Sequence, residues 1–386
     1  MFVQQSAHGQ GSAFIRGMTG QQTLLLFDGI RVNNSTYRQG PNQYAFTIDS
    51  RTIGSIEVLR GGGSTRYGSD ALGGVIAAYP LDPLWSEGQW LVRPELFLRN
   101  TSADSELGGR AQLQVSGPVK GGSLGFIGGV GYRDVGMLQS GGRVENPNPS
   151  TPLGKYPLVP AYAKDGVTQL GTGFRELTAD GRFVLRLGDY QKLTAATYHY
   201  LQFDVPRTDQ CPPPYAPAGT CLTYEQQFRH LGYLTYEGKL SDSLWPLRLS
   251  VSVQVQHERQ RLDDPSVLVQ RIGTDKVLTL GFVAAARTRP IVLHRRVSLS
   301  LHYGLDQYTD WISSEAYRTF TDLNQTAKQS RGQYLDGSSY SSGGVYADGA
   351  LSLPKSVTVF GGVRLSYAVA RAPSESLSGS RAVNQS

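Results

Sequence analysis

The chain has 386 residues, of which 39% are hydrophobic and 18% charged, and its formal net charge is +6. No apolar run approaches the roughly 20 residues that a spanning helix needs, so a membrane-spanning form would have to be built from strands. The lysines and arginines form no dense run, so the sequence gives no reason to expect a nucleic-acid partner.

The first eighty residues have the pattern of a small mixed domain. Phe14-Ile15 and Leu24–Phe27 are short strand candidates, and Asp28-Gly29 is a strong turn signal that leads into Ile30–Val32. Residues 34–47 are polar and irregular. A helical turn is expected within residues 48–55, just before the next strand.

The segment Ile56–Ile76, IEVLRGGGSTRYGSDALGGVI, dominates this region. Its apolar start, Ile56–Leu59, predicts a short buried strand, which the glycines after Arg60 would end. The glycines around Gly73 let other segments approach the backbone closely.

This segment closely resembles the end of the plug domain of TonB-dependent outer-membrane receptors, whose usual form is IE-x-x-RG…YG-x-x-A-x-GG-V-I. Ile15-Arg16-Gly17 and Leu24–Asn33, LLLFDGIRVN, match further plug motifs in the same order. The resemblance implies a plug domain over residues 1–82, incomplete at its start, followed by part of a barrel over residues 88–386. The matched motif residues are Ile15, Gly17, Asp28, Gly29, Glu57, Gly61, Tyr67, Gly68, Gly73 and Gly74.

The resemblance also assigns roles to charged plug residues. In similar receptors, the arginines that match Arg16 and Arg60 lock the plug against acidic residues on the inner wall of the barrel. The alternative, in which both arginines bond nearby carbonyl groups within the plug, stays open. Glu57 is expected to pair within the plug, and Asp28-Gly29 and Gly73-Gly74 are interpreted as structural.

From Trp90 onward, apolar and polar residues alternate. This pattern predicts a mainly β fold, a partial transmembrane antiparallel β-barrel with about 11 strands, which would follow the small α+β plug that the resemblance implies. A soluble β-sandwich also alternates, but several runs here exceed the usual length of its strands. The alternation predicts that Val251, Val253, Leu299, Leu301, Val363 and Leu365 face lipid, and that Arg248, Gln254, Arg296 and Arg364 face inward.

Short and long connections are expected to alternate, as they do in bacterial barrels. The predicted short turns are Thr101–Ser105, Gly188-Asp189, Ser241–Ser243 and Pro354–Ser356, and the predicted long connections are 134–170, 204–224, 261–275 and 313–339. One long connection contains Cys211 and Cys221, the only two cysteines, in the proline-rich run CPPPYAPAGTC. Their spacing predicts a disulfide and hence an oxidising compartment, although two unpaired thiols remain the alternative.

Candidate ligand contacts come from the resemblance. In such receptors the ligand touches apical plug loops and outside loops, which points here to Tyr37, Arg38, Gln43 and Tyr44 of the run YRQGPNQY. The histidines are scattered over different predicted strands, and no catalytic grouping is close in sequence. We therefore expect no catalytic residue, metal ligand or cofactor.

The function implied is energised uptake of a scarce small ligand, such as a ferric siderophore, across the outer membrane of a Gram-negative bacterium. The implied partners are outer-membrane lipid and the TonB complex, whose contact segment would precede this chain. We expect the chain to be the middle of a longer protein, a curved half-barrel sheet around its plug. A passive porin, an adhesin barrel and an all-β surface enzyme or lectin are the alternatives.

Overall fold

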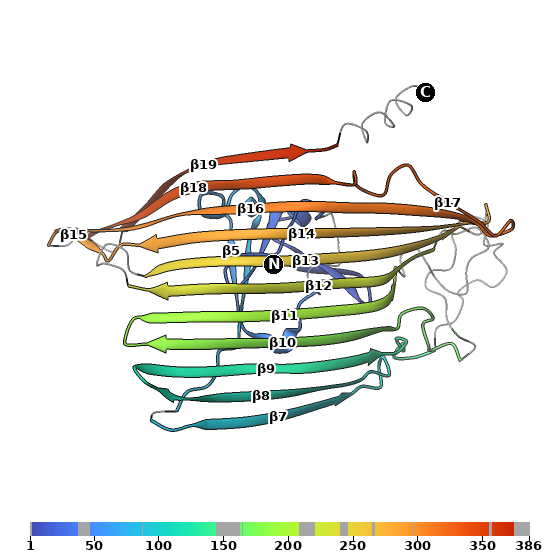
Figure 1. Cartoon of the computed structure of the whole chain (residues 1–386), viewed down its shortest axis with the longest axis horizontal. Helices are drawn as coiled ribbons and strands as arrows, with labels where there is room; N and C mark the ends of the chain where they lie inside the picture. Colours follow the sequence, from blue (N-terminus) through green and yellow to red (C-terminus); the bar gives the residue numbers. More distant parts are fainter. Residues whose placement is uncertain are drawn as a thin grey trace.

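The computed structural model describes residues 2–37, 47–86, 88–143, 163, 165–207, 221–239, 246–264, 267–295, 297–354 and 357–373. These residues form a small N-terminal unit, residues 2–80, and one large antiparallel sheet that lies against it (Figure 1). Among the described residues, no helix has the length and apolar character needed to cross a membrane.

The N-terminal unit contains a hairpin and a four-stranded sheet. The hairpin pairs β1 (Phe2–Ala7) with β2 (Gln10–Phe14). The sheet has the order β4-β3-β6-β5, with β3 and β6 parallel and the other pairs antiparallel. Its strands are β3 (Thr23–Phe27), β4 (Ile30–Arg31), β5 (Ile53–Arg60) and β6 (Gly74–Pro80), and its short helices are η1 (Gly20–Gln22), η3 (Ser50–Thr52), α1 (Ser64–Tyr67) and η4 (Ser69–Ala71).

The predicted local elements of this unit are confirmed. The strand predicted at Leu24–Phe27 is β3, and the helical turn predicted within 48–55 is η3. Asp28 and Gly29 form the turn between β3 and β4 with φ angles of 48° and 74°. Both angles are left-handed, which is the geometry that short hairpin turns need and that Asp and Gly tolerate best.

The strand predicted at Ile56–Leu59 is present as part of β5, but the prediction that it is buried is wrong. Ile56 is 57% and Leu59 47% exposed. The strand order explains this, because β5 lies at the edge of the small sheet and pairs only with β6. Sequence periodicity indicates which segments are apolar, but it does not show which strand ends at an edge.

The large sheet is a meander in which each long strand pairs with the next one. Eleven strands form its main path, as many as the sequence predicted, and β15 and β17 pair only with β16, which brings the sheet to 13 strands. The strands of the path are β7 (Leu91–Asn100), β8 (Leu107–Val119), β9 (Gly122–Val135), β10 (Phe174–Leu187), β11 (Gln191–Pro206), β12 (Cys221–Gly238), β13 (Leu247–Asp264), β14 (Val269–Arg287), β16 (Val297–Phe320), β18 (Ser338–Leu353) and β19 (Val357–Arg371). The short ones are β15 (Ile291–His294) and β17 (Gln325–Lys328).

The sheet curves around the N-terminal unit. Arg51 of η3 lies 3.2 Å from the ring centroid of Phe97 in the edge strand β7. At the opposite edge, Arg364 of β19 donates to the carbonyl oxygen of Arg66 at 3.1 Å. Eleven strands at about 4.8 Å spacing span about 50 Å, so one small unit reaches both edges only if the sheet is curved. The predicted half-barrel arrangement is therefore confirmed.

We call the side that contacts the N-terminal unit the inner face and the opposite side the outer face. Val251, Val253, Val363 and Leu365 are exposed on the outer face, as predicted. Arg248, Gln254 and Arg364 bond the N-terminal unit, also as predicted. Leu299 and Leu301 are half-buried, and Arg296 lies outside the described residues.

The predicted alternation of short and long connections is present only in part. The turn after β10, Gly188-Asp189, is tight, as predicted. The short connection at 101–106, however, lies at the same end of the sheet as 136–173, because β7 and β9 run in the same direction (Figure 1). Most of the connection predicted at 261–275 is strand, since β13 runs to Asp264 and β14 starts at Val269. Strand also occupies 313–320 and 325–328 of the connection predicted at 313–339, because polar residues that face inward look like loop in sequence.

Gly74 generates a prediction about the N-terminal unit. Its φ is +156°, and a Cβ there would lie 2.3 Å from the carbonyl oxygen of Leu59. Gly74→Ala should therefore destabilise the unit by about 1–3 kcal/mol. The measurement is the urea concentration at which the unit becomes cleavable by protease. Gly361→Ala, where a Cβ would meet nothing within 4 Å, is the control and should behave like the unchanged chain.

Candidate functional site

Carboxylates of the N-terminal unit and the segment after it meet arginines on the inner face of the large sheet. Asp28 lies in the β3–β4 turn, Asp49 precedes η3 and Asp82 follows β6. Each of these three carboxylates pairs with at least one arginine of the sheet. These contacts are charge-assisted hydrogen bonds that attach the two parts of the chain to each other.

Asp28 is the most enclosed of these carboxylates. Its Oδ2 atom accepts hydrogen bonds from Arg182 Nη1 and the Tyr233 hydroxyl, both at 2.7 Å. Arg248 Nη2 lies 3.2 Å from Oδ1. Burial raises the pKa of Asp28, but the Arg182 and Arg248 guanidinium groups outweigh it and lower this pKa to about 2. The carboxylate is therefore ionised and bound at neutral pH.

The other ion pairs surround Asp28. Asp82 lies 2.7 Å from Arg182 Nε and 2.9 Å from Lys192 Nζ. Burial raises the pKa of Asp82, but these two cations together lower it below its usual value. Arg182 thus bridges Asp28 and Asp82 with different nitrogen atoms, which ties the β3–β4 turn to the segment that leaves the N-terminal unit.

Further contacts hold the unit at two other places on the inner face. Asp49 Oδ2 lies 3.1 Å from Arg110 Nη1 and accepts a bond from Thr178 Oγ1 at 2.8 Å. In α1 the charges are reversed, because Arg66 Nη2 lies 2.7 Å from Asp348 Oδ1 of β18. Acidic and basic residues of the unit therefore form ion pairs with different strands of the sheet.

Side chains on the inner face also bind the backbone of the N-terminal unit directly. Gln254 Nε2 donates to the Arg31 carbonyl oxygen at 2.7 Å, and the Ser35 amide donates to Asp310 Oδ2 at 2.7 Å. Arg229 donates to the Val32 carbonyl oxygen at 3.2 Å. The sheet thus bonds backbone groups of Arg31, Val32 and Ser35, as buried polar backbone requires.

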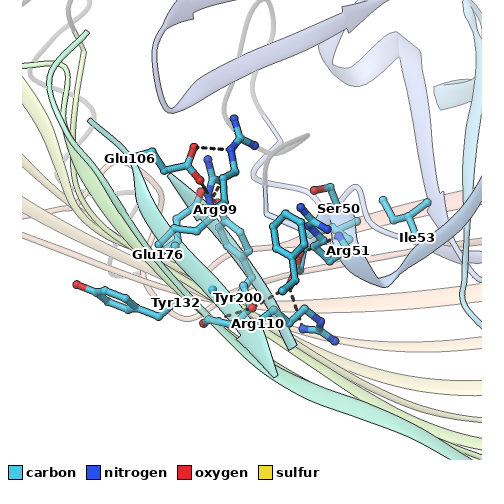
Figure 2. A pocket seen from close by; sticks show the side chains of 17 residues that line it. Ser50, Arg51, Ile53, Arg99, Glu106, Arg110, Tyr132, Glu176 and Tyr200 are labelled. Atoms are coloured by element: carbon cyan, nitrogen blue, oxygen red, sulfur yellow. Dashed lines mark hydrogen bonds and ion pairs between the residues drawn. The ribbon is translucent and has the colours of Figure 1, made fainter. Parts of the chain in front are cut away.

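A cavity of about 400 Å³ lies between the η3 segment and strands β7 to β11 (Figure 2). Arg51, Ser50 and Ile53 enter it from the N-terminal unit, while Arg99, Arg110, Tyr132 and Tyr200 belong to the sheet (Figure 2). Its wall also contains Asp49, Glu106, Arg133 and Glu176. The cavity is therefore lined by both signs of charge and by aromatic rings, which suits a polar ligand.

One wall of the cavity is a chain of ion pairs that crosses four strands. Arg99 Nε lies 3.2 Å from Glu106 Oε2, and Arg133 Nε donates to Glu106 Oε1 at 2.8 Å. Arg133 Nη1 donates to Glu176 Oε2 at 2.6 Å, and the Tyr200 hydroxyl donates to the same carboxylate. The side chains of Arg99 and Arg133 are 49% and 42% exposed, so these two are the members of this chain that a ligand reaches most directly.

These residues belong to a longer row of inward-facing residues. Its successive cross-strand partners are Arg99, Gly108, Arg133, Glu176, Gln202, Gln227, Glu258, Asp275 and Ser314. The row is basic at its β7–β9 end and acidic at β13–β14. Gln202 Nε2 donates to the Gly9 carbonyl oxygen at the tip of the β1–β2 hairpin at 3.4 Å. Both amide atoms of the fully buried Gln227 lack a hydrogen-bond partner among the described residues, so water or a ligand can bind there.

The sequence alone does not reveal this row, and it indicates only a turn at Asp28. The alternation within a single strand does show which of its residues share a face, so the inward-facing residues of each strand can be predicted from the sequence. Which member of one strand lies beside which member of the next depends on register, and register is decided by the paired strands together.

The structure places the predicted plug residues as follows. Arg16 and Arg60 are exposed, and among the described residues no ion pair involves either one, so their locking role stays a prediction. Ile15 is buried and Tyr67 packs against the cluster that contains Leu24 and Val75. Glu57 accepts a bond from the Tyr79 hydroxyl at 3.3 Å, within the unit.

The remaining predicted sites fall partly outside the described residues. Tyr37 is buried, and its carbonyl oxygen accepts a bond from Gln21 Nε2 at 2.7 Å. Arg38, Gln43 and Tyr44 lie outside the described residues, so their part in ligand contact is untested. Cys221, at the start of β12, is buried and disulfide-bonded, whereas its predicted partner Cys211 lies outside the described residues.

The sequence comparisons concern the N-terminal unit. Residues 1–75 match the family model described as TonB-dependent Receptor Plug Domain. The vitamin B12 transporter BtuB of Vibrio vulnificus strain CMCP6 is 39% identical over 77 residues, which are 20% of this chain and 12% of that protein.

Comparison of the folds concerns nearly the whole chain. The copper transporter OprC superposes with a TM-score of 0.71 at 15% identity, over 96% of this chain and 50% of that one. The siderophore receptor PirA of Acinetobacter baumannii gives a TM-score of 0.62 at 19% identity, over 95% of this chain and 52% of that one. The chain therefore spans about half the length of these solved structures and has their fold.

Asp28 generates a prediction about attachment of the N-terminal unit. Asp28→Asn leaves buried guanidinium groups without their shared carboxylate, which should weaken attachment by about 3 kcal/mol. This loss is at the lower end of the range for a broken buried ion pair, because Arg182 still pairs with Asp82 and Arg248 still pairs with Glu237. The readout is the urea concentration at which the unit becomes cleavable by protease. Asp70→Asn, which breaks a partly exposed pair with Arg31 inside the unit, should cost less than about 1 kcal/mol. Equal losses in both variants would contradict the role of Asp28.

The low pKa of Asp28 generates a second prediction, on acid. Because its folded pKa is depressed from 3.8 to about 2, its contribution is fully present above pH 3.8 and is lost as the pH falls through about 2. The difference in urea resistance between the unchanged chain and Asp28→Asn should therefore be constant from pH 7 to about 4 and shrink between about pH 4 and 2. A difference that stays constant down to pH 2 would show that the charge of Asp28 is not what the variant removes.

Proposed function

Because the chain belongs to the TonB-dependent receptors, with residues 1–75 as its plug domain, we propose that it acts in the active uptake of a small ligand. The observation that carries the proposal is the plug held by ion pairs on the polar inner face of a barrel-type sheet. Such an arrangement closes a wide pore at rest and can be opened without breaking covalent bonds. In this proposal the protein lies in the outer membrane of a Gram-negative bacterium, with the outer face of the sheet against lipid.

The attachment of the plug suits a part that is pulled loose. Asp28, Asp49 and Asp82 are bound at separate places on the inner face, so a directed force breaks the pairs in sequence. Water that enters as each pair opens solvates the separated charges and lowers the cost of the next step. The partner that would supply the force is the TonB complex, and the predicted lock at Arg16 and Arg60 forms part of the same proposal.

The cavity and the polar row support a polar, oxygen-rich ligand. Arg133 offers guanidinium donors to negative oxygen atoms, and Phe97 and Tyr200 offer aromatic surface. A ferric siderophore combines these features and is the ligand class that we propose first. Proteins with the same fold are described as a copper transporter and as siderophore receptors, so the fold itself accommodates several ligand classes.

Arg133 generates a prediction about binding. In detergent, the protein should bind a ferric siderophore from a panel that also contains cobalamin, haem and copper, as measured by tryptophan fluorescence. Arg133→Ala should weaken that binding by about tenfold or more, the effect of losing one charge-assisted contact. Arg175→Ala is the matched control, since Arg175 lies on β10 but pairs with Asp204 on the exposed side of the sheet.

Two results would contradict the proposal. If the Arg133 and Arg175 substitutions weakened ligand binding equally, the cavity would not be part of the binding site. Binding of no ligand in the panel, together with passive flux of small solutes through the protein in vesicles, would favour the porin-like alternative.

A further inference from the structure

Two histidines lie side by side on the outer face of the sheet, away from the plug. His199 of β11 and His230 of β12 are direct cross-strand partners, and their Nδ1 atoms are 2.8 Å apart. Their chain neighbours Tyr198 and Leu231 pack against the plug. Since successive side chains of a strand alternate, both imidazoles point to the opposite side, where the proposed function places lipid.

The surroundings make the pair unusual. Its lateral neighbours on the same face are Ala179 of β10 and Val255 of β13. One step nearer the long connections, Leu201 pairs with Phe228. Polar groups in a lipid-facing surface are costly and are therefore functional by default, unlike polar groups on the inner face. Among the described residues, the two imidazoles have only each other and Thr197 as hydrogen-bond partners.

The distance between the two nitrogen atoms fits a particular coordination geometry. With metal–nitrogen bonds of about 2.0 Å, two imidazoles at a right angle around a metal have nitrogens about 2.8 Å apart. A tetrahedral angle would require about 3.3 Å. The observed 2.8 Å belongs to an N–H···N hydrogen bond between the rings, and it is closer to the separation in the square-planar or octahedral geometry of Cu²⁺ or Ni²⁺ than to that around tetrahedral Zn²⁺.

Thr197 bonds the second ring nitrogen of His199. Its Oγ1 atom lies 2.9 Å from His199 Nε2, and it accepts a hydrogen bond when His199 carries its proton on Nε2. In that tautomer His199 Nδ1 carries a lone pair that points at His230. Such a bond to the second nitrogen is how proteins orient imidazole ligands of metals.

Space for further ligands of a metal exists beside the pair. Gly232 follows His230 by two residues on the same face and pairs with Thr197. A Cβ at Gly232 would meet nothing closer than 3.6 Å. No group of three or more His, Cys, Asp or Glu side chains is placed to hold a metal in the described part of the chain, so the site would have these two imidazoles as its protein ligands.

From this geometry we propose that His199 and His230 form a two-imidazole binding site for a divalent transition metal, Cu²⁺ or Ni²⁺, on the outer face of the sheet. His230 shifts its proton from Nδ1 to Nε2 on binding, so both Nδ1 lone pairs reach the metal and no oxidant or reductant is involved. The site is separate from the cavity at Arg133, and it stands or falls independently of the transported ligand.

The test uses the 386-residue chain without a histidine tag, in detergent, titrated with Cu²⁺ in the presence of glycine as a weak competitor. Calorimetry should give one tight site per chain, and the electron paramagnetic resonance spectrum should show coupling to two imidazole nitrogens. His199→Ala and His230→Ala should each weaken the site by at least about tenfold. Thr197→Val, which leaves both imidazoles in place, should weaken it less.

His257→Ala is the matched control. His257 also lies on the outer face, but its Nε2 atom bonds Gln226 and its ring stacks on Phe228. The proposal is overturned if His257→Ala weakens binding as much as His199→Ala, or if the double variant of His199 and His230 binds as the unchanged chain does. An alanine variant that loses its β-type circular dichroism has not folded, and the test then uses the electron paramagnetic resonance spectrum of the unchanged chain with Cu²⁺. Coupling to fewer than two imidazole nitrogens in that spectrum overturns the proposal.

Discussion

Buried charge on the inner face of the sheet has to be paired, and the rest of the structure depends on this constraint. Arg110 and Arg182 are nearly inaccessible to solvent, and neither could remain there ionised without a carboxylate. The plug and the segment after it supply Asp28, Asp49 and Asp82 at the positions where these arginines point. The polar inner face therefore specifies both where the plug lies and how it is oriented.

The plug in turn depends on the sheet for its core. Phe27, Ile30 and Val32 form one cluster with Ala196, Leu231 and Tyr233 of the sheet, so one face of β3 is buried only when the plug is in place. The other face packs within the plug, around Leu24 and Val75. The cluster around Leu24 and Val75 can therefore hold the fold of the plug while the plug separates from the sheet at the other cluster and at the ion pairs.

The two faces of the sheet carry chemistry of different kinds because they meet different surroundings. On the inner face, Arg133, Glu176 and their neighbours form a continuous charged row, which the wet interior tolerates. On the outer face, the His199–His230 pair stands among apolar side chains such as Val255.

The sequence by itself determined the strand content, the faces of the strands and the presence of the plug. Period-two alternation is a local property, so Val251 and Arg248 could be assigned to opposite faces without knowledge of their neighbours. The DG turn and the glycine-rich motif are likewise local, because they reflect backbone angles that few other residues adopt.

Only the tertiary structure decided which of these residues act together. Asp28 belongs to a turn in the sequence, and it becomes the centre of the attachment because β10, β12 and β13 bring Arg182, Tyr233 and Arg248 to it. The exposure of Ile56, the row through Arg133 and the contact of His199 with His230 arise in the same way, from strand order and register. Those are properties of pairs of strands far apart in the chain, and no single stretch of sequence contains them.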